Sequence, residues 1–398
     1  MESSAESRLE AKRTKRRELR QQRLGRFYQD VSVLFLAVVV LLAALSLIAK
    51  DRAFSDAENR TLAQRPTLTL AGLADGSFFS GYSSYLADQF FGRDAWISLD
   101  TLGTRLTLNH QVNGIYIGRD GYLFSDPDQP DEERLADKLE AVNAFAKRHD
   151  DINIMFLVAP GSSSILTEKL PAHAPIRNQI PDIQDIQRQL DSRIQVLDVS
   201  NALLEHRGEE IYYRTDHHWT SLGAYYAYTS AVGRLSQGMS QPSFSVLTVA
   251  DDFEGTLASQ SGVHRAKDSI DVYLPQTDTA YYVYYPDSQT RVTSLFVSSA
   301  LEEKDKYTVF FGGNHPVVEI HTTVDNGHNL LVFKDSYANS FIQFLTTYYD
   351  NIILVDPRYY YDSLSTLLTA NGITDVLFLY SGDTFMTDGT LTDVLATG

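Results

Sequence analysis

The sequence predicts an α/β protein: a parallel β-sheet covered by helices on both faces, with a β-rich insertion, preceded by one transmembrane helix. Unbroken apolar segments of strand length alternate with helix-like segments in two parts of the chain, which is typical of a buried parallel sheet. Near the N-terminus, residues 31–49 carry no charge and are long enough to cross a bilayer. These two observations decide the fold class.

The N-terminal segment predicts a membrane anchor with a defined orientation. Residues 1–30 form a basic tail with nine Lys and Arg against five acidic residues. Residues 31–49 then span roughly 28 Å as a helix, at about 1.5 Å per residue. The positive-inside rule places the tail in the cytoplasm and everything after Lys50 outside. A cleaved signal peptide is the alternative, although its apolar region is usually shorter. We therefore expect a single-pass protein of the cell membrane with an extracellular catalytic domain.

Composition excludes several classes of function. The formal net charge is −17, and beyond residue 30 the chain holds 34 − 9 = 25 basic and 51 − 5 = 46 acidic residues. So acidic a body repels nucleic acid, and it carries no basic stripe with stacking aromatics, so nucleic-acid binding is rejected. The chain has no cysteine, which excludes disulfides, zinc–thiolate sites and cysteine nucleophiles.

Residues 50–104 predict a juxtamembrane helical arm between the anchor and the α/β domain. Aromatic and aliphatic residues recur at helical spacing across 78–97. A β-hairpin follows at 113–124, where apolar residues alternate around Gly-Arg-Asp-Gly. We place the α/β domain at 105–398.

The domain predicts alternating strands and helices. Expected strands are 152–158, 194–199, 329–333, 352–355 and 376–380, and expected helices are 133–148, 182–192, 220–235, 337–349 and 361–370. Ligands of such sheets collect at the carboxyl ends of the strands. Three features lie at such ends: the run Ser162–Ser164, the pair Asp335-Ser336, and the segment Asp356–Arg358.

Residues 241–328 differ from the rest of the domain. Short Tyr- and Val-rich segments are separated by turn residues, with no helical signal between them. The expected strands are 270–274, 280–285, 292–297, 307–311 and 317–322. We expect a β-rich insertion or lid within the α/β body.

The stretch 214–221, Arg-Thr-Asp-His-His-Trp-Thr-Ser, holds a candidate catalytic base. Asp216 lies two residues before His218, and a carboxylate beside a neutral imidazole can activate a hydroxyl nucleophile at neutral pH. The candidate nucleophile is Ser336, 118 residues further on, at a strand-to-helix turn. A helix N-terminus there favours developing negative charge.

Structural alternatives remain open for each of these residues. Asp335 or Ser336 can simply cap the following helix. Asp216 and His218 can form a hydrogen-bonded pair at a helix start, and the adjacent His217 raises a metal site. No His-x-x-x-His or Glu-x-x-His spacing accompanies them, so we expect no metal and take His217 as structural, pointing away from His218.

Other residues are candidates for oxyanion and substrate contacts. Gly313 and Asn314 follow a predicted strand and can offer a backbone N–H and an amide to an oxyanion, although a glycine-rich turn explains them equally. Arg358 can bind a carboxylate or a sugar, or form a surface salt bridge. Tyr337 is one of 23 tyrosines that suit a carbohydrate surface or ordinary core packing.

Several segments together resemble the DHHW protein family, which is related to alginate O-acetyltransferases of the AlgJ and AlgX type with an SGNH-hydrolase-like fold. The matching segments are Glu58–Arg60, Asp88–Phe90 with Arg93, Asn113–Phe124, Thr215–Thr220, Asp252–Thr256 and Asp335–Tyr337. The resemblance implies a triad in which Ser336 is the nucleophile, His218 the base and Asp216 its orienting carboxylate. No carbohydrate-binding module follows the last predicted strand, which departs from the acetyltransferases.

The resemblance implies an O-acetyltransferase acting on a cell-surface polysaccharide through an acetyl-enzyme, without a cofactor. A membrane-bound acyltransferase of the MBOAT type is the implied partner that supplies acetyl groups. A carbohydrate acetylesterase uses the same triad and differs only in the acceptor. A non-catalytic protein for polysaccharide binding or assembly is the alternative from another class.

Overall fold

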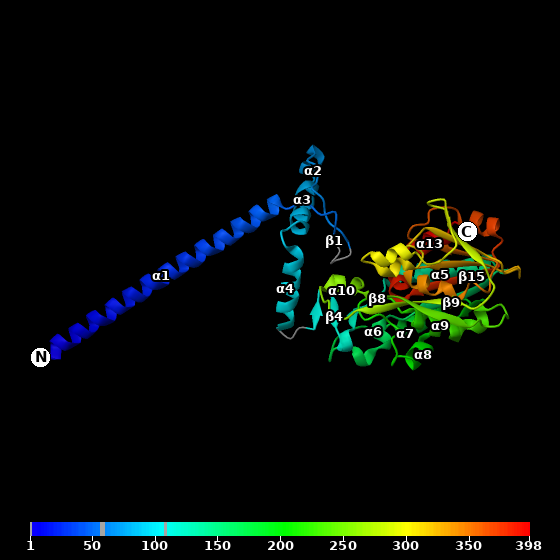
Figure 1. Cartoon of the computed structure of the whole chain (residues 1–398), viewed down its shortest axis with the longest axis horizontal. Coiled ribbons are helices and arrows are strands. Elements are labelled where there is room, and N and C mark those ends of the chain that lie inside the picture. Colours follow the sequence, from blue (N-terminus) through cyan, green and yellow to red (C-terminus); the bar gives the residue numbers. More distant parts are fainter. Residues whose placement is uncertain (1, 56–59, 107–109) are drawn as a thin grey trace. The chain divides into compact units, whose positions relative to one another are not determined.

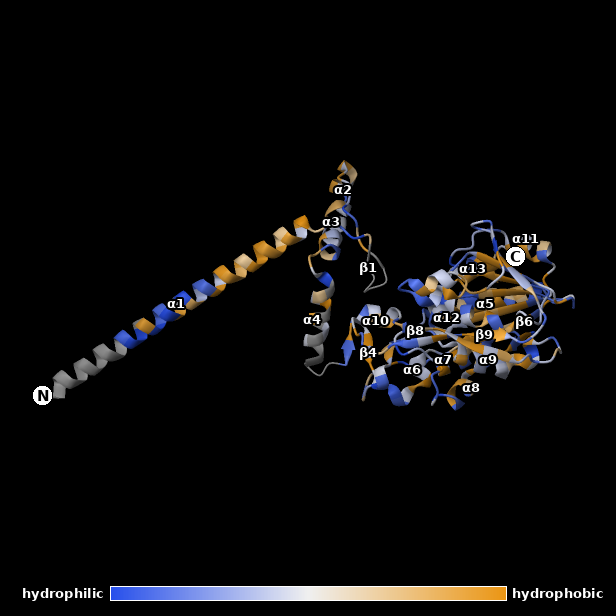
Figure 2. Cartoon of the chain, in the orientation of Figure 1, coloured by the Kyte–Doolittle hydropathy of each residue, from blue (hydrophilic) through white to orange (hydrophobic). Residues whose placement is uncertain are grey.

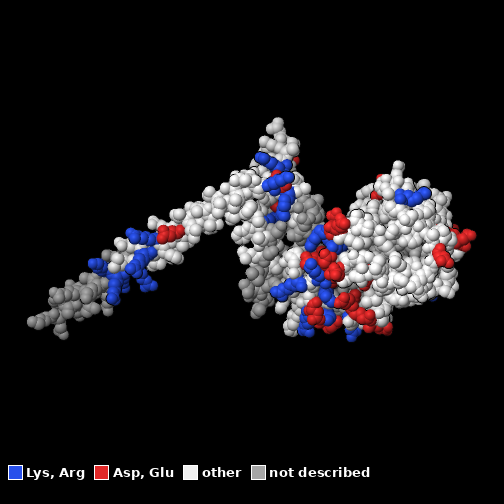
Figure 3. Space-filling view, in the orientation of Figure 1, with Lys and Arg blue, Asp and Glu red and all other residues white. Residues whose placement is uncertain are grey.

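The charge-free stretch forms the second part of one long helix, α1 (Glu2–Ile48), in a computed structural model that describes residues 2–55, 60–106 and 110–398. The portion Lys15–Ile48 is long and apolar enough to cross a membrane. Figure 2 shows the hydrophobic colouring gathered toward the C-terminal part of α1, and Figure 3 shows Lys and Arg along its earlier described part. Of the segments that carry the resemblance, Glu58 and Asn59 lie outside the described residues.

The chain divides into two units, and the division falls within helix α4. The first unit comprises residues 1–55 and 60–97, and the second comprises residues 56–59 and 98–398. The first unit contains α1, β1 (Phe54–Ser55), β2 (Arg60–Thr61), α2 (Leu70–Ala74), α3 (Ser77–Asp88) and the start of α4 (Arg93–Leu106). The helix expected over 78–97 is thus two helices. Gly92, at φ +69°, adopts the left-handed conformation that separates them.

A mixed eight-stranded sheet forms the centre of the second unit, in the order β11-β10-β12-β14-β13-β15-β6-β7. From β14 to β7 all neighbouring strands are parallel, whereas β12, β10 and β11 pair antiparallel. The parallel strands are β6 (Asn153–Ala159), β7 (Ile194–Val196), β13 (Asn329–Lys334), β14 (Asn351–Val355) and β15 (Asp375–Ser381). The antiparallel strands are β10 (Tyr281–Tyr285), β11 (Thr290–Val292) and β12 (Val317–Thr322). The predicted α/β class and its parallel strands are confirmed, and the sheet is extended at one edge.

Two buried layers cover the two faces of this sheet, as a period of two requires. In β6, Ile154, Phe156 and Val158 pack into one layer, and the alternate residues Met155 and Leu157 pack into the other. The first layer contains α5 (Glu132–Arg148), α7 (Ile180–Gln189), α11 (Leu364–Asn371), α12 (Gly382–Thr387) and α13 (Thr390–Leu395). The second contains α8 (Ser200–Glu205) and α9 (Ser221–Leu235) (Figure 1). Helices on both faces explain why the central strands read as continuous apolar runs.

Smaller elements lie beside the main sheet. The predicted hairpin is present as β4 (Ile115–Ile117) and β5 (Leu123–Ser125), with β3 (Gln111–Val112) added at its edge. Within 241–328, β8 (Phe244–Phe253) and β9 (Asp268–Pro275) form a separate ribbon, with α10 (Thr256–Ser261) between them. β10, β11 and β12 instead belong to the main sheet, so much of this segment is integral to the α/β body.

Several local expectations differ from the structure. The strand expected over 292–297 is absent there, because β11 (Thr290–Val292) ends where that strand was expected to begin. The helix expected over 337–349 is two short 3-10 helices, η5 (Ser336–Ser340) and η6 (Ile342–Phe344). Residues 337–349 are all buried, so no polar face marks a continuous helix. The strand expected over 307–311 is a 3-10 helix, η4 (Lys306–Val309). The run Ser162–Ser164 opens the short helix α6 (Ser162–Ile165) and is buried.

Candidate active site

Strand β13 delivers Asp335 and Ser336 to the carboxyl edge of the sheet, and the two residues have separate roles. Asp335 is the N-cap of η5, where its Oδ1 accepts from the backbone N–H of Tyr337 at 2.9 Å. Its Oδ2 accepts from the backbone and the hydroxyl of Ser381, at 2.9 and 2.7 Å, at the end of β15. The cap is therefore supplied by Asp335, and the half-buried Ser336 hydroxyl points elsewhere.

The loop that carries Asp216 and His218 is tied to the Ser336 segment through Trp219. A β-bridge joins Tyr212 to Trp219, so the chain folds tightly back on itself before α9. The fully buried indole of Trp219 donates to the backbone carbonyl of Tyr337 at 2.9 Å. This bond fixes the loop against the residue that follows Ser336.

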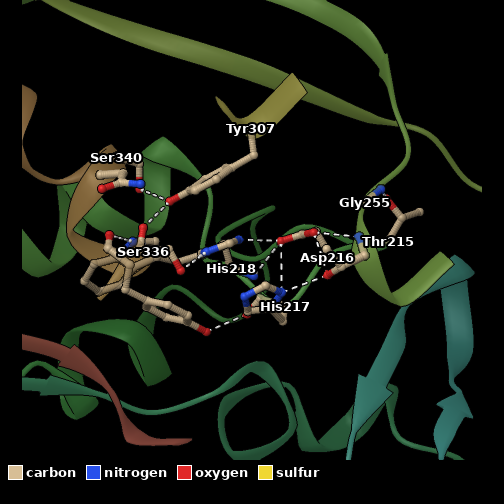
Figure 4. Close-up of polar contacts among 12 residues, drawn as sticks. Thr215, Asp216, His217, His218, Gly255, Tyr307, Ser336 and Ser340 are labelled. Carbon is tan, nitrogen blue, oxygen red and sulfur yellow. Dashed lines mark hydrogen bonds and ion pairs between the residues drawn. The ribbon is translucent and has the colours of Figure 1, made fainter. Parts of the chain in front are cut away.

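These elements bring Asp216, His218 and Ser336 into one hydrogen-bonded line (Figure 4). Nε2 of His218 lies 2.8 Å from Oγ of Ser336. Nδ1 of the same imidazole lies 2.5 Å from Oδ1 of Asp216. Both distances are within the reach expected of a nucleophile, a base and the group that orients the base.

Asp216 is held by donors that the sequence did not reveal. Its Oδ2 accepts from the backbone N–H and the hydroxyl of Thr256, at 2.8 and 3.0 Å. A side chain at Gly255 cannot fit, since its Cβ would stand 2.3 Å from Cβ of Asp216. Gly255 and Thr256 are the last two residues of a segment that carries the resemblance, but only the fold shows that α10 begins beside the carboxylate of Asp216.

Tyr307 is a second feature that the sequence did not reveal. Its ring stacks on the imidazole of His218, with centroids 3.8 Å apart and planes 12° apart. Its hydroxyl donates to the backbone carbonyl of Ser336 at 3.0 Å and lies 3.3 Å from Oγ of Ser340 (Figure 4). Tyr307 therefore restrains both the base and the serine, although nothing in its local sequence distinguishes it from other tyrosines.

Burial and charge keep the imidazole neutral and the carboxylate ionised. Burial, together with the nearby His217, lowers the pKa of His218 to about 4, against the opposing effect of Asp216. Burial raises the pKa of Asp216, but the two histidines and the hydrogen bonds from His218 and Thr256 outweigh it and hold the pKa below its usual range. At neutral pH, His218 can therefore accept a proton.

The two oxyanion candidates, Gly313 and Asn314, differ in whether their donor groups already take part in hydrogen bonds. The backbone N–H of Gly313 donates to the carbonyl of Phe310 at 3.3 Å, so it is already engaged in a turn. Asn314 is exposed, and its Oδ1 lies 3.4 Å from Nδ2 of Asn339 in η5. Asn339 lies three residues after Ser336, on the same side of a 3-10 helix. Of the two candidates, only the side chain of Asn314 remains open to a ligand.

The two substrate-binding candidates are engaged in internal contacts. Tyr337 is only 3% exposed, and its hydroxyl donates to the carbonyl of His217 at 2.5 Å. Arg358 makes a two-pronged ion pair with the buried Asp356, at 2.8 and 2.6 Å. Tyr337 is thus a packing residue, and Arg358 adopts the salt-bridge alternative.

His217 does not point away from His218 as expected. Its ring lies 3.9 Å from that of His218, and its Nδ1 is 2.8 Å from Oγ1 of Thr256. Asp216, His217 and His218 offer ligand atoms within 4.8 Å of one another, a spacing compatible with a metal ion. However, Nδ1 of His218 and both oxygens of Asp216 already take part in hydrogen bonds, so a metal would have to displace them.

A comparison with known families finds a match over the region that contains these residues. Residues 176–355 match the DHHW protein family. The matched stretch contains Asp216, His218 and Ser336, so the resemblance seen in the sequence is confirmed. A comparison with curated proteins found no match.

Solved structures support the fold over most of the chain. A DHHW family protein from Eubacterium siraeum is 27% identical, with a TM-score of 0.62, and the match covers 72% of this chain and 96% of that one. The structure of Bacillus cereus PatB1 with a sulfonyl adduct is 18% identical, with a TM-score of 0.59, covering 70% of this chain and 97% of that one. The O-acetyltransferase domain of Pseudomonas putida AlgJ also matches, at 17% identity and a TM-score of 0.43, over 68% of this chain and 92% of that one.

Proposed function

We propose that this protein is a membrane-anchored, extracytoplasmic O-acetyltransferase that modifies a cell-surface polysaccharide with a Ser-His-Asp triad. One observation carries the proposal: the Oγ of the partly exposed Ser336 lies 2.8 Å from a buried imidazole whose other nitrogen is held by Asp216. A buried, neutral histidine between a hydroxyl and an ionised carboxylate serves acyl transfer and is unusual for mere packing.

The geometry fits a two-step transfer. Ser336 Oγ attacks the carbonyl carbon of the acetyl donor while its proton moves to Nε2 of His218. The tetrahedral intermediate collapses, and the leaving group departs with that proton, which leaves an acetyl ester on Ser336. A sugar hydroxyl then attacks the ester and gives its proton to His218, and Ser336 Oγ leaves with that proton. Throughout, Asp216 holds the Nδ1–H of the imidazole and stabilises its charged form.

We take the exposed side chain of Asn314, which lies against Asn339 of η5, as the candidate that stabilises the oxyanion. The N–H of Gly313 is already engaged in a turn, so in this proposal it does not donate to the oxyanion. Gly313 instead shapes the backbone that precedes Asn314, through its φ of +111°. A donor aimed at the developing negative charge is worth about 3–4 kcal/mol in such reactions. Asn314→Ala should therefore lower kcat more than it raises KM.

Location and partners extend this proposal. The helix α1 is long and apolar enough to span a membrane, and its basic N-terminal side favours a cytoplasmic tail and an extracellular second unit. An acetyl group that originates in the cytoplasm then needs a membrane partner, for which an MBOAT-type acyltransferase is the natural class.

Two alternatives use the same fold. An acetylesterase would use the same triad with water as the acceptor, and the partly exposed Ser336 permits it. A polysaccharide-binding protein without catalysis would keep the fold but would not need the aligned hydrogen bonds of Asp216 and His218.

The test is acetyl transfer by the full chain in detergent, with an activated acetyl ester as donor and with or without an oligosaccharide acceptor. We expect an acetyl-enzyme on Ser336 by mass spectrometry and faster turnover with the acceptor than with water. Ser336→Ala should abolish acetyl-enzyme formation, and Ser288→Ala, in the exposed turn between β10 and β11, is the matched serine control. Equal turnover with and without the sugar favours the esterase. Unchanged activity in Ser336→Ala rules out the triad, and loss of activity with a metal chelator favours the cluster of Asp216, His217 and His218 as a metal site.

A further inference from the structure

An apolar stripe on helix α3 and just beyond its end remains exposed within the first unit. Phe79, Leu86 and Phe90 follow at intervals of seven and four residues, and they are 63%, 50% and 37% exposed. The interval of seven places Phe79 and Leu86 along one side of α3, and Phe90 follows two residues after the helix ends at Asp88. The neighbouring Trp96 is 47% exposed, and its ring lies 6.4 Å from that of Phe90. A stripe of large apolar side chains in contact with water marks a surface that binds something.

The same side of α3 faces the end of the apolar helix α1. A groove of about 420 Å³ lies between them in the first unit. Its apolar walls come from Ala43 and Leu47 of α1 and from Leu86 and Phe90 of the α3 segment. In addition, the backbone N–H of Phe91 donates to Oγ of Ser46 at 3.0 Å. The segment that follows α3 is thus joined to α1 two residues before α1 ends at Ile48.

This attachment fixes the depth of α3 once α1 spans a bilayer. The wall of the groove on α1 runs from Ala43 to Ala49, which corresponds to about 9 Å along a helix axis. Interfacial helices bury their apolar side about 5–10 Å into the boundary between headgroups and acyl chains. The stripe on α3 therefore lies at the depth where acyl chains begin.

The polar residues of the groove agree with this placement. Asp51 and Arg65 line it, and the hydroxyl of Tyr85 contacts Asp51 at 3.1 Å. Tyr82 lines it as well, and tyrosine and tryptophan are enriched at membrane–water interfaces. The groove thus combines apolar walls with charged and aromatic groups, as the headgroup boundary requires.

We propose that α3 is an interfacial helix whose stripe, Phe79, Leu86 and Phe90, inserts between the acyl chains of the lipids that surround α1. This inference rests on the anchoring part of the proposed function and adds a second membrane contact to it. The occupant of the groove is a phospholipid acyl chain, with its headgroup near Arg65 and Tyr85.

The two tryptophans of the chain allow a direct test. Trp96 is exposed beside the stripe, whereas Trp219 is fully buried in the second unit. The full chain is reconstituted in phosphatidylcholine vesicles brominated either near the headgroup end or near the methyl end of the acyl chain. We expect quenching of tryptophan fluorescence, stronger with bromine near the headgroup end, and its loss in Trp96→Phe.

Charge variants on the two sides of α3 provide the matched control. Leu86→Glu places a carboxylate in the stripe and should lower the quenching of Trp96 at least about two-fold. Ser84→Glu, also exposed on α3, should leave it unchanged. The chain remains anchored by α1 in both variants.

Protease protection of residues 1–30 reports insertion of α1 independently. Insertion of α1 without quenching of Trp96 contradicts the interfacial helix and leaves the anchor intact. Quenching of Trp96 by soluble acrylamide but not by brominated lipid also contradicts it, and indicates a protein partner on the stripe. Failure of α1 to insert contradicts both this inference and the proposed anchor. Acetyl transfer is not part of the readout, so failure of the catalytic proposal is distinguished from all of these.

Discussion

At the scale of single residues, the site depends on a division of tasks between neighbours. Asp335 caps η5 and binds Ser381, which leaves the hydroxyl of Ser336 to His218. His218 in turn stacks on Tyr307, and Asp216 accepts a hydrogen bond from the backbone N–H of Thr256. The sequence predicted Asp216, His218 and Ser336 because each belongs to a recognisable motif. It did not predict the stacking ring or the donors of Asp216, because their roles depend on segments that meet only in the folded chain.

The state of His218 predicts the acid limb of the pH–rate profile. A base accepts a proton only when it is neutral, so activity falls as the pH falls through its pKa. Burial and the neighbouring His217 hold that pKa at about 4, below the ordinary value near 6.5. We expect kcat/KM to hold from neutral pH to about pH 5 and to fall about tenfold per pH unit below about pH 4.

The variant His217→Gln tests the cause of this depression. It removes the neighbouring side chain that helps to lower the pKa of His218, so the acid limb should move to higher pH, while the limb in Tyr226→Phe, far along α9, should not move. Circular dichroism at each pH separates the limb from unfolding. If the activity of the native chain already falls at pH 6.5 or above, the lowered pKa of His218 is contradicted.

At the scale of elements, alternation of apolar strands and helices was enough to predict β6, β13, β14 and β15. Segments without a polar face were not predictable in the same way. The buried run after Ser336 is two 3-10 helices because every side of it packs. Likewise, β12 pairs antiparallel with β14 at the sheet edge, and short strands carry no signal of the partner they will choose.

The close approach of Gly255, just before α10, to Asp216 predicts that one added methyl group at Gly255 strongly lowers activity. A Cβ at Gly255 would stand 2.3 Å from Cβ and from Oδ2 of Asp216, so Gly255→Ala must displace the carboxylate. A displacement of about 1 Å lowers kcat about 100-fold. Gly208→Ala, where nothing lies within 4 Å, is the control and should retain activity. Full acetyl transfer by Gly255→Ala would show that Asp216 does not orient His218.

The buried ion pair at the end of β13 predicts that loss of Asp356 strongly lowers the free energy of unfolding. Lys334 is 1% exposed and lies 4.0 Å from the fully buried Asp356, which also pairs with Arg358. Asp356→Ala leaves two cations without their shared partner, and breaking such a buried pair costs about 3–5 kcal/mol. Urea unfolding of the variant should show this loss, while Asp185→Ala, from an exposed pair with Arg188, should change stability by less than about 0.5 kcal/mol. A loss below about 1 kcal/mol would contradict the account.

At the scale of the whole molecule, the charge pattern separates a basic tail, an apolar helix and an acidic body. Composition predicted this order correctly, because a charge-free run of helix length is unambiguous in sequence. The proposed orientation of the chain rests on the basic tail alone, and it decides whether Ser336 would meet extracellular sugars.

The absence of cysteine makes the orientation directly measurable, since any introduced thiol is unique. Ser7→Cys marks the basic tail, and Ser288→Cys marks the exposed turn between β10 and β11. With a membrane-impermeant maleimide on intact cells, we expect Ser288→Cys to label and Ser7→Cys to label only after the cells are opened, because the positive-inside rule holds the tail in the cytoplasm. The reverse pattern would place Ser336 inside the cell, away from any surface polysaccharide, and labelling of neither variant on intact cells would place the second unit on the cytoplasmic side as well.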